Sequence, residues 1–262
     1  MMLEVDHLSF SYRQDNPLFQ DVSFSFDKGQ VLSILGANGA GKSTLLNCIA
    51  NLLTPLSGEI RLYGKPLSKM DLREISRIIG YVPQTHTPAY AYTVRDFVVM
   101  GRAPYLGTFQ QPRRQDYKLV DETLDEMGLL HLAQRPYTEL SGGERQQVTI
   151  ARVIVQQPEL IMLDEPTNHL DYGNQIRALS MVRSLVKRGF GVIMTSHNPD
   201  HVLLLGGQVG LLSDDGSFLV GPSEAVMTEA RLRELYHSDL YLTYVERAGR
   251  QACVPGKLHF AE

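Results

Sequence analysis

Alternation between apolar and polar residues marks the beginning of the chain. Large apolar side chains occupy nearly every second position from 3 to 12 and again from 22 to 26. The segment 15–17, Asp-Asn-Pro, separates the two runs with residues typical of a turn. A period of two is the pattern of a strand with one buried face, so we predict antiparallel strands here.

Short segments that are apolar throughout occur later in the chain. They comprise residues 31–35, 78–82, 160–163 and 191–195. Continuous apolar runs of this length are typical of strands buried on both faces of a parallel sheet. Helix-like segments lie between the first three of these runs, so the pattern predicts an α/β fold. In an open sheet of this kind ligands bind at the carboxyl ends of the strands, where each of these runs meets a polar residue.

Helical periodicity takes over between the second and third apolar runs. Thr93, followed three residues later by Asp96, resembles a capping box and begins one amphipathic helix. Residues 116–127 form a second amphipathic helix, which Gly128 ends. We therefore expect residues 85–157 to be a helical subdomain inserted into the α/β frame.

The last third of the chain predicts smaller elements. A hairpin turns at Asp215 and Gly216, a helix covers residues 222–237, and a strand covers residues 240–245. The polar residues beyond this strand follow no interpretable pattern. We expect a single domain over residues 1–262, consisting of a core (1–84 and 158–237), the helical subdomain (85–157) and a tail (238–262).

Composition narrows the class of protein. Hydrophobic residues make up 43% of the 262 positions and charged residues 21%, which is enough apolar material for a sizeable core. A net charge of -4 argues against nucleic acid as the main partner. Cys48 and Cys253 have no metal-type spacing, which favours a reducing compartment. No secretory signal and no apolar run of about 18 residues is present, so we expect no membrane-spanning segment.

A glycine-rich motif follows the first fully apolar run. It reads Gly36, Ala37, Asn38, Gly39, Ala40, Gly41, Lys42 and Ser43, followed by Thr44. This order fits the phosphate-binding loop pattern G-x-x-x-x-G-K-[ST]. The glycines bring backbone N–H groups close to phosphates, Lys42 adds a positive charge, and the Ser43 hydroxyl can hold Mg²⁺. The motif predicts that the chain binds a nucleotide.

Three other polar positions each allow two interpretations. Asp164 and Glu165 follow the run 160–163, where Asp164 either serves Mg²⁺ or simply ends the strand. His197 follows the run 191–195, either as a ligand-facing group or as an ordinary satisfied histidine. Ser141, Gly142 and Gly143 precede a helix, as an anion site or as a plain capped start.

Tyr12 also has two interpretations. It could stack on an adenine ring, or it could end a half-buried strand. Spacing alone favours the strand position, because aromatic residues are common in strands.

The order of these motifs resembles a known family. The phosphate loop is followed by Gln84, by Leu-Ser-Gly-Gly-Glu-Arg-Gln at 140–146, by Leu-Ile-Met-Leu-Asp-Glu-Pro at 160–166 and by Thr-Ser-His at 195–197. Over nearly its whole length the chain resembles the nucleotide-binding subunit of ATP-binding cassette (ABC) transporters. The resemblance implies a P-loop NTPase cassette with a RecA-like core, an N-terminal antiparallel β-subdomain and an inserted α-helical subdomain.

Two further segments resemble one branch of that family. They are residues 101–107, Gly-Arg-Ala-Pro-Tyr-Leu-Gly, and residues 221–226, Gly-Pro-Ser-Glu-Ala-Val. Both are similar to importers of iron chelates, haem and cobalamin, and the chain looks closest to a molybdate and tungstate importer. The resemblance therefore implies an ATPase that powers import of metal chelates or metal oxyanions.

The resemblance also implies a role for each motif residue. Tyr12 would stack on adenine, and the phosphate loop would bind the phosphates of ATP. Ser43, Gln84 and Asp164 would serve Mg²⁺, with Gln84 also placed near the attacking water. Glu165 would act as general base, with Lys42 and His197 stabilising the negative charge. Ser141, Gly142 and Gly143 would bind the ATP of a second copy, and the segment Asn168, His169, Leu170 and Asp171 would lie across the seam between the copies.

Partners follow from the same resemblance. We expect a head-to-tail homodimer with two ATP molecules at its interface, bound to two copies of a polytopic membrane permease subunit. A periplasmic or extracellular substrate-binding protein would take part indirectly. The protein would be peripheral, on the cytoplasmic side of the bacterial inner (cell) membrane. Residues 85–92, with Tyr90 and Tyr92, would form a groove for a permease helix, or else an ordinary surface loop.

Rival classes fit the sequence less well. DNA-repair and chromosome-structure ATPases with this cassette carry long heptad repeats, and none lie between Lys42 and Ser141. A small-molecule phosphotransferase would bind an acceptor hydroxyl, whereas Asp164, Glu165 and His197 suit water activation. Translation-type ABC proteins join two cassettes, and exporters are normally fused to a membrane domain. The sequence favours a transporter ATPase.

Overall fold

A mixed sheet lies at the centre of the computed structural model, which describes residues 1–13, 17–84, 90–107 and 109–257. Within these residues its strands follow the order β10-β9-β3-β8-β7-β6, and all run parallel except β10. The bounds are β3 (Val31–Leu35), β6 (Ile79–Val82), β7 (Leu160–Leu163), β8 (Gly191–Ser196), β9 (Gln208–Leu212) and β10 (Phe218–Pro222). The four predicted apolar strands are therefore confirmed, and so is the hairpin around Asp215.

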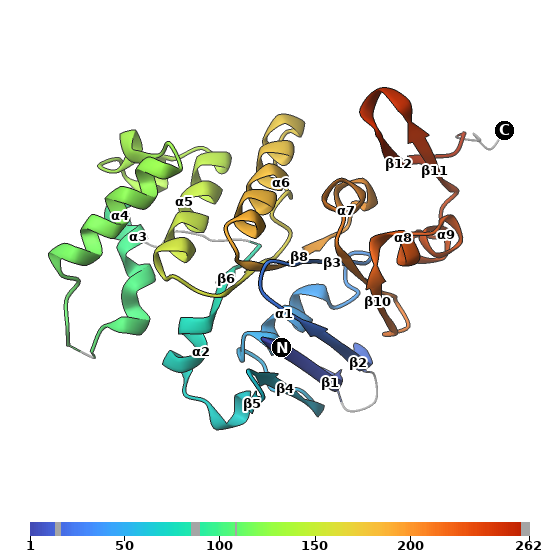
Figure 1. Ribbon diagram of the computed structural model, residues 1–262, viewed down its shortest axis with the longest axis horizontal. Helices are drawn as coiled ribbons and strands as arrows, with labels where there is room; N and C mark the ends of the chain where they lie inside the picture. The colour runs from blue at the N-terminus through green and yellow to red at the C-terminus, as the bar shows by residue number, and fades with distance from the viewer. Residues whose placement is uncertain (14–16, 85–89, 108, 258–262) are drawn as a thin grey trace.

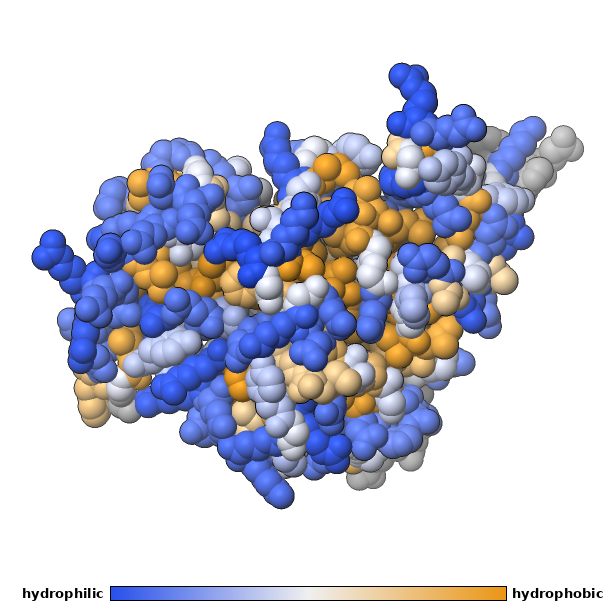
Figure 2. All heavy atoms as spheres, viewed as in Figure 1, coloured by the Kyte–Doolittle hydropathy of each residue, from blue (hydrophilic) through white to orange (hydrophobic). Residues whose placement is uncertain are grey.

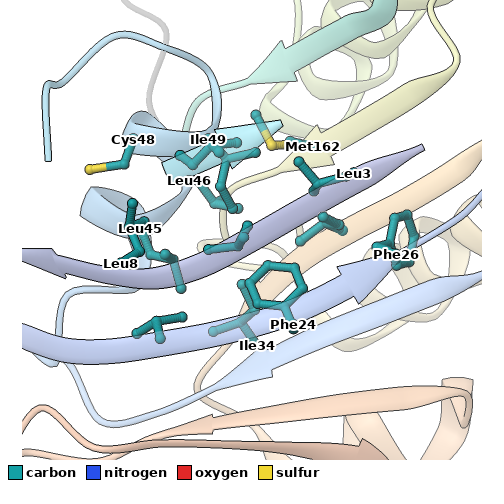
Figure 3. Close-up of a cluster of buried hydrophobic side chains, with 14 of the residues drawn as sticks. Leu3, Leu8, Phe24, Phe26, Ile34, Leu45, Leu46, Cys48, Ile49 and Met162 are labelled. Carbon is teal, nitrogen blue, oxygen red and sulfur yellow. The ribbon is translucent and has the colours of Figure 1, made fainter. Parts of the chain in front are cut away.

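A second, antiparallel sheet is formed by the N-terminal strands (Figure 1). Its order is β2-β1-β4-β5, with β1 (Leu3–Phe10), β2 (Phe19–Phe26), β4 (Ser57–Leu62) and β5 (Lys65–Pro66). Helix α1 (Lys42–Ile49) shares one buried cluster with it, in which Leu8, Phe24, Leu45 and Met162 belong to four different elements (Figure 3). The two sheets are thus joined through a common core, which fixes the start of α1.

Helices make up the predicted insertion. They are α3 (Val94–Val99), the 3₁₀ segment η2 (Met100–Tyr105), α4 (Arg114–Glu126), the 3₁₀ segments η3 (Leu130–Leu132) and η4 (Tyr137–Glu139), and α5 (Gly142–Val155). Thr93 caps α3 by accepting the Asp96 N–H, and Gly128 adopts a φ of +70° after α4, as expected. These helices enclose their own buried cluster, at one side of the molecule (Figure 1). The boundary at residues 85–157 stays a prediction, because residues 85–89 lie outside the described ranges.

Helices α2 and α5–α7 surround the central sheet. Their bounds are α2 (Leu72–Ile78, after the 3₁₀ segment Leu67–Lys69), α6 (Tyr172–Lys187) and α7 (Pro199–Leu205). Helix α5 has two faces: Val148 and Ala151 pack in the helical cluster, whereas Ile150 and Ile154 pack with β7, β8 and α6. It therefore connects the helical subdomain to the core.

The C-terminal region departs from the prediction at one point. The helix expected over residues 222–237 is wrong as a single element, because α8 (Ser223–Val226) and α9 (Glu229–Tyr236) are separate. Met227 leaves helical geometry with a ψ of 80°, and Thr228 caps α9 with its side chain. The tail forms a hairpin of β11 (Leu240–Val245) and β12 (Arg250–Pro255), joined by the 3₁₀ turn Glu246–Ala248. Arg250 fastens it to α7 through a two-bond contact with Asp200.

Apolar side chains gather across the middle of one face, whereas the margins are hydrophilic (Figure 2). None of the helices in the described part of the chain has the length and apolar character needed to cross a bilayer.

Candidate active site

The glycine-rich loop connects β3 to α1 at the carboxyl edge of the central sheet. Gly41 precedes α1 with a φ of +104°, a conformation that disfavours any residue with a side chain. At Gly36, a Cβ atom would lie 2.6 Å from the carbonyl oxygen of Leu212. The loop therefore needs glycine at both positions, at one for backbone conformation and at the other for close packing against β9.

Lys42 is folded over this loop. Its Nζ donates to the carbonyl oxygens of Gly36 (2.8 Å) and Ala37 (2.9 Å), and it lies 3.3 Å from Oε1 of Glu165. Only 4% of the Lys42 side chain is exposed. A desolvated positive charge thus stands where the phosphates of a nucleotide would meet the loop.

Asp164 is held at the end of β7. The Thr195 hydroxyl of β8 donates to Oδ1 of Asp164 (2.7 Å) and accepts the Glu165 N–H (2.7 Å). The Tyr81 hydroxyl lies 3.4 Å from Oδ2, and burial together with the negative charge of Asp164 raises the pKa of Tyr81 above its ordinary value. Tyr81 therefore stays protonated and donates toward the Asp164 carboxylate. Each oxygen of Asp164 keeps a lone pair for a hard cation, as Mg²⁺ requires.

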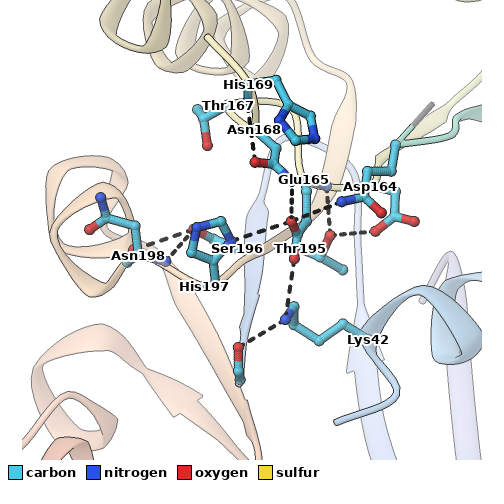
Figure 4. A network of polar contacts seen from close by, with 12 residues as sticks. Lys42, Asp164, Glu165, Thr167, Asn168, His169, Thr195, Ser196, His197 and Asn198 are labelled. Carbon is cyan, nitrogen blue, oxygen red and sulfur yellow. Dashed lines mark hydrogen bonds and ion pairs between the residues drawn. The ribbon is translucent and has the colours of Figure 1, made fainter. Parts of the chain in front are cut away.

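Glu165 is the centre of the polar network (Figure 4). Its Oε2 atom is 3.2 Å from Nε2 of Gln84, 3.0 Å from Nδ2 of Asn168 and 3.3 Å from Nδ1 of His197. The backbone at Glu165 has a φ of +46°, in the left-handed region that side-chain-bearing residues rarely adopt. The ends of β6, β7 and β8 and the phosphate loop thus bring Gln84, Glu165, His197 and Lys42 together, as the sequence predicted for strand ends in an open sheet.

One cleft joins these groups to the phosphate loop. Its lining consists of Tyr12, Leu18, Asn38, Gly39, Gly41, Lys42, Ser43, Thr44, Gln84, Glu165 and Asn168. Ser43 and Gln84 therefore share the cleft, and Asp164, which directly precedes Glu165, lines a neighbouring pocket with Gln84 and Glu165. Hydroxyl, amide and carboxylate oxygens are ligands that suit Mg²⁺, so these residues fit the cation that the sequence implied.

Tyr12 stands at the mouth of this cleft and beyond the end of β1. Its side chain is largely exposed, at 68%, and its hydroxyl lies 3.1 Å from that of Thr44. The edge of the ring rests on Phe10, with 4.9 Å between ring centroids. The half-buried strand position does not describe this residue, because one broad aromatic face is left open toward solvent.

The Ser-Gly-Gly segment lies outside this cleft, although Gly142 lines a neighbouring pocket together with Gln84 and Glu165. Ser141 caps α5 because its hydroxyl oxygen accepts the Glu144 N–H (3.4 Å). The same hydroxyl donates to the Glu144 carboxylate (2.7 Å), which also accepts the Ser141 N–H (2.8 Å). Ser141 and Gly142 are exposed. Among the described residues, neither they nor Gly143 line the cleft of the phosphate loop.

Asp171 lies near the Ser-Gly-Gly segment. It caps α6 by accepting the Asn174 N–H (2.8 Å), and this bond lowers the pKa of Asp171 below its ordinary value. A Cβ atom on Gly143 would lie 3.5 Å from the side chain of Asn174. The starts of α5 and α6 therefore lie next to each other, outside the lining of the phosphate-loop cleft.

Two functional contacts were missed by sequence reasoning. Thr195 couples Asp164 to Glu165, and the only available signal was a hydroxyl inside an otherwise apolar strand. Asn168 was assigned to the seam between copies, but its side chain also donates to Glu165 within the same chain. Residues 85–89 of the predicted permease groove lie outside the described residues, whereas Tyr90 and Tyr92 are exposed with ring centroids 5.8 Å apart.

Comparison with known proteins gives the same result as the motifs. A family model described as ABC transporter matches residues 19–168. An uncharacterised ABC transporter ATP-binding protein of Haemophilus influenzae is 40% identical over 91% of this chain and 90% of its own length. The molybdate import ATP-binding protein MolC of the same organism is 38% identical over 91% of this chain and 89% of its own length.

A solved structure supports the same family assignment. A metal-chelate type ABC transporter in an inward-facing conformation superposes with a TM-score of 0.87 at 36% identity, covering 98% of both chains. This chain belongs to the ABC transporter family, as one of the ATP-binding proteins that hydrolyse ATP to drive transport.

Proposed function

We propose that the protein hydrolyses ATP in pockets shared between two copies of the chain, and so powers the import of a metal chelate or metal oxyanion. The observation that carries the proposal is the separation of two phosphate-binding elements. The phosphate loop and Glu165 share one cleft, whereas Ser141 and Gly142 are exposed outside its lining, with Gly142 in a neighbouring pocket that also reaches Gln84 and Glu165. A head-to-tail arrangement would place the start of α5 from one copy over the cleft of the other.

The residues of the cleft support a specific division of work. Backbone N–H groups of residues 36–44 would hold the phosphates, and the open face of Tyr12 would stack on the adenine ring. Lys42 would exchange the carbonyl oxygens of Gly36 and Ala37 for phosphate oxygens. Ser43, Gln84 and Asp164 would hold Mg²⁺, which when bound neutralises charge on the phosphate oxygens.

Glu165 is the group best placed to activate water. Four polar groups surround its carboxylate and orient it, and Asp164 is committed to Thr195 and the cation. Hydrolysis needs a water aligned with the γ-phosphorus and stabilisation of the spreading negative charge. We assign the first task to Glu165 and the second to Lys42, His197 and Ser141 of a second copy.

Partners and cargo extend the proposal to the membrane. Relatives named for molybdate import and for metal-chelate transport support a cargo of metal oxyanion or metal chelate. We propose two permease subunits and, indirectly, a substrate-binding protein, with this protein peripheral on the cytoplasmic side of the membrane. Tyr90 and Tyr92, exposed beyond Gln84, would contact the permease and report the state of the nucleotide site.

Mixing two inactive variants tests the shared pocket. Lys42→Ala destroys the phosphate-loop half of a pocket, and Ser141→Arg destroys the other half. In a mixed dimer both lesions fall in one pocket and leave the second pocket intact. We expect the mixture to recover roughly a quarter of the wild-type ATPase rate, because half of the dimers are mixed and each keeps one of two pockets.

A matched mixture provides the control. Lys42→Ala and Glu165→Gln both affect the phosphate-loop half, so mixing them leaves each pocket with one lesion and should recover nothing. If the mixture of Lys42→Ala and Ser141→Arg were as inactive as this control mixture, the shared pocket would be overturned. Uptake of molybdate and of iron chelates into vesicles that contain the protein and its permease would then separate the two cargo classes.

A further inference from the structure

His201 is a buried histidine for which the proposed reaction has no use. It lies in the first turn of α7, only 6% exposed, immediately after Asp200. Its Nδ1 atom is 3.2 Å from the hydroxyl oxygen of Thr167, and its Nε2 atom is 3.3 Å from Nδ2 of Asn198. One imidazole ring therefore contacts two loop segments that follow different strands.

The direction of these hydrogen bonds is fixed by the helix cap. Oδ1 of Asn198 accepts the Asp200 N–H (2.9 Å), which leaves the Asn198 amide nitrogen facing His201 as a donor. Nε2 of His201 must then accept, so the ring proton is on Nδ1 and points to Thr167. Burial lowers the pKa of His201, His197 acts in the same direction, and Asp200 opposes them. The ring is therefore neutral, with a single defined tautomer.

The two partners of His201 belong to the two segments that carry the reacting groups. Thr167 follows Glu165 by two residues, within a turn closed by the Asn168 N–H on the Glu165 carbonyl (3.0 Å). Asn198 directly follows His197. Thr167 and Asn198 therefore belong to the same two loops as Glu165 and His197 (Figure 4). Thr167 itself is only 5% exposed, so its hydroxyl cannot turn to bulk water for a substitute partner.

We propose that His201 is a positioning residue that fixes the loop carrying Glu165 relative to the loop carrying His197. The proposal rests on the proposed roles of Glu165 and His197. His201 contacts neither ATP nor the attacking water; it acts through Thr167 and Asn198. An apolar ring in its place would fill the space but remove the partner of the buried Thr167 hydroxyl and of the Asn198 amide N–H. The two loops would then no longer be held in a fixed position relative to each other.

Kinetics of matched variants test this role. We expect His201→Phe and Thr167→Val each to lower kcat about tenfold with an unchanged KM for ATP, since binding groups are untouched. The double variant should be no slower than the slower single variant, because both remove the same link. Thr149→Val is the control: it removes a buried hydrogen bond to Tyr137 (2.9 Å) in the helical subdomain and should lower the melting temperature without changing kcat. Additive losses in the double variant, or a raised KM with normal kcat, would overturn the proposal.

Nitrogen-15 NMR of the histidine rings gives a readout that requires no catalysis. One of the eight histidines should show a proton on Nδ1 and a bare Nε2, and this signal should vanish in His201→Phe and shift in Thr167→Val. A ring protonated on Nε2 would refute the link. The mixing experiment distinguishes the two levels: if it recovers activity while His201→Phe has a normal kcat, only the positioning role fails. If it recovers nothing while the ring signal and the kcat losses appear, the shared pocket fails and the positioning role survives.

Discussion

Helices α1 and α5 both have glycine at their starts, but the first N–H groups of the two helices find different partners. Helix α1 starts at Gly41, which has no side chain to accept from the first N–H groups. Helix α5 starts at Ser141, which forms a complete capping box with Glu144. The first N–H groups of any helix need partners. The start of α1 is therefore left to be completed by a ligand, whereas the start of α5 is stable as a free end.

The two helix starts also differ in how far their surroundings are exposed to solvent. Lys42 and Glu165 at α1 are 4% and 9% exposed in their side chains, within a network of charged groups. Ser141 and Gly142 at α5 face solvent. Within one copy, the start of α1 lies in the lining of the phosphate-loop cleft, whereas the start of α5 is exposed outside that lining. The two helix starts therefore differ in exposure, although both carry recognisable motifs. The buried start of α1 is proposed to bind ATP within its own copy, and the exposed start of α5 is proposed to complete the pocket of a second copy.

The largest effect should come from the pocket side. Glu165→Gln keeps the size of the side chain and its hydrogen bonds in part, but removes the base. We expect ATP turnover to fall by on the order of 10²–10⁴ while ATP binding, measured with a fluorescent nucleotide, persists. Glu159→Gln is the control, because that carboxylate precedes the same strand and interacts with Tyr63 and Lys28, which lie outside the cleft lining. Wild-type turnover by Glu165→Gln would remove this residue from the mechanism.

A smaller effect should come from the mouth of the cleft. Tyr12→Ala removes a stacking surface worth about 1–3 kcal/mol per base, so we expect the KM for ATP to rise about tenfold with little change in kcat. Tyr12→Phe keeps the ring but loses the contact with the Thr44 hydroxyl, and should behave nearly as wild type. The measurement is the initial rate against ATP concentration. Equal losses in both variants would point to the hydroxyl and away from stacking.

The smallest effect should come from the surface side. Ser141→Ala and Thr93→Ala each remove the cap of a helix in the helical subdomain, at a cost of about 1 kcal/mol in stability. We expect similar drops in melting temperature for both. Only Ser141→Ala should also slow hydrolysis, by about 3- to 10-fold, through loss of one hydrogen bond to the neighbouring ATP. Equal ATPase rates in the two variants would mean that Ser141 serves the helix alone.

Much of the frame could be predicted because local pattern and tertiary role agree. The apolar runs before Gly36, Asp164 and His197 became buried parallel strands, and their common edge brought the polar residues together. Thr93 and Ser141 cap helices because a hydroxyl followed three residues later by a carboxylate satisfies free N–H groups in any context.

Other features depend on contacts that sequence does not show. Helix α6 was not predicted, since its first turn contains Gly173 and Asn174, and its cap Asp171 drew attention as a site residue. The single helix expected over 222–237 fails at Met227, where no glycine or proline gives warning. The register of Thr195 opposite Asp164, and of His201 opposite Thr167, arises only when β7, β8 and α7 are packed.

The packing of Gly36 against β9 affects the thermodynamics of binding. Leu212 and Leu18 press on Gly36 and Gly41 from outside the loop, so its shape is set when the chain folds. Arriving ATP then loses little affinity to ordering the backbone around its phosphates. The conformational entropy of the phosphate loop is lost during folding and not during binding. More of the free energy of ATP binding is therefore available to bring two copies together.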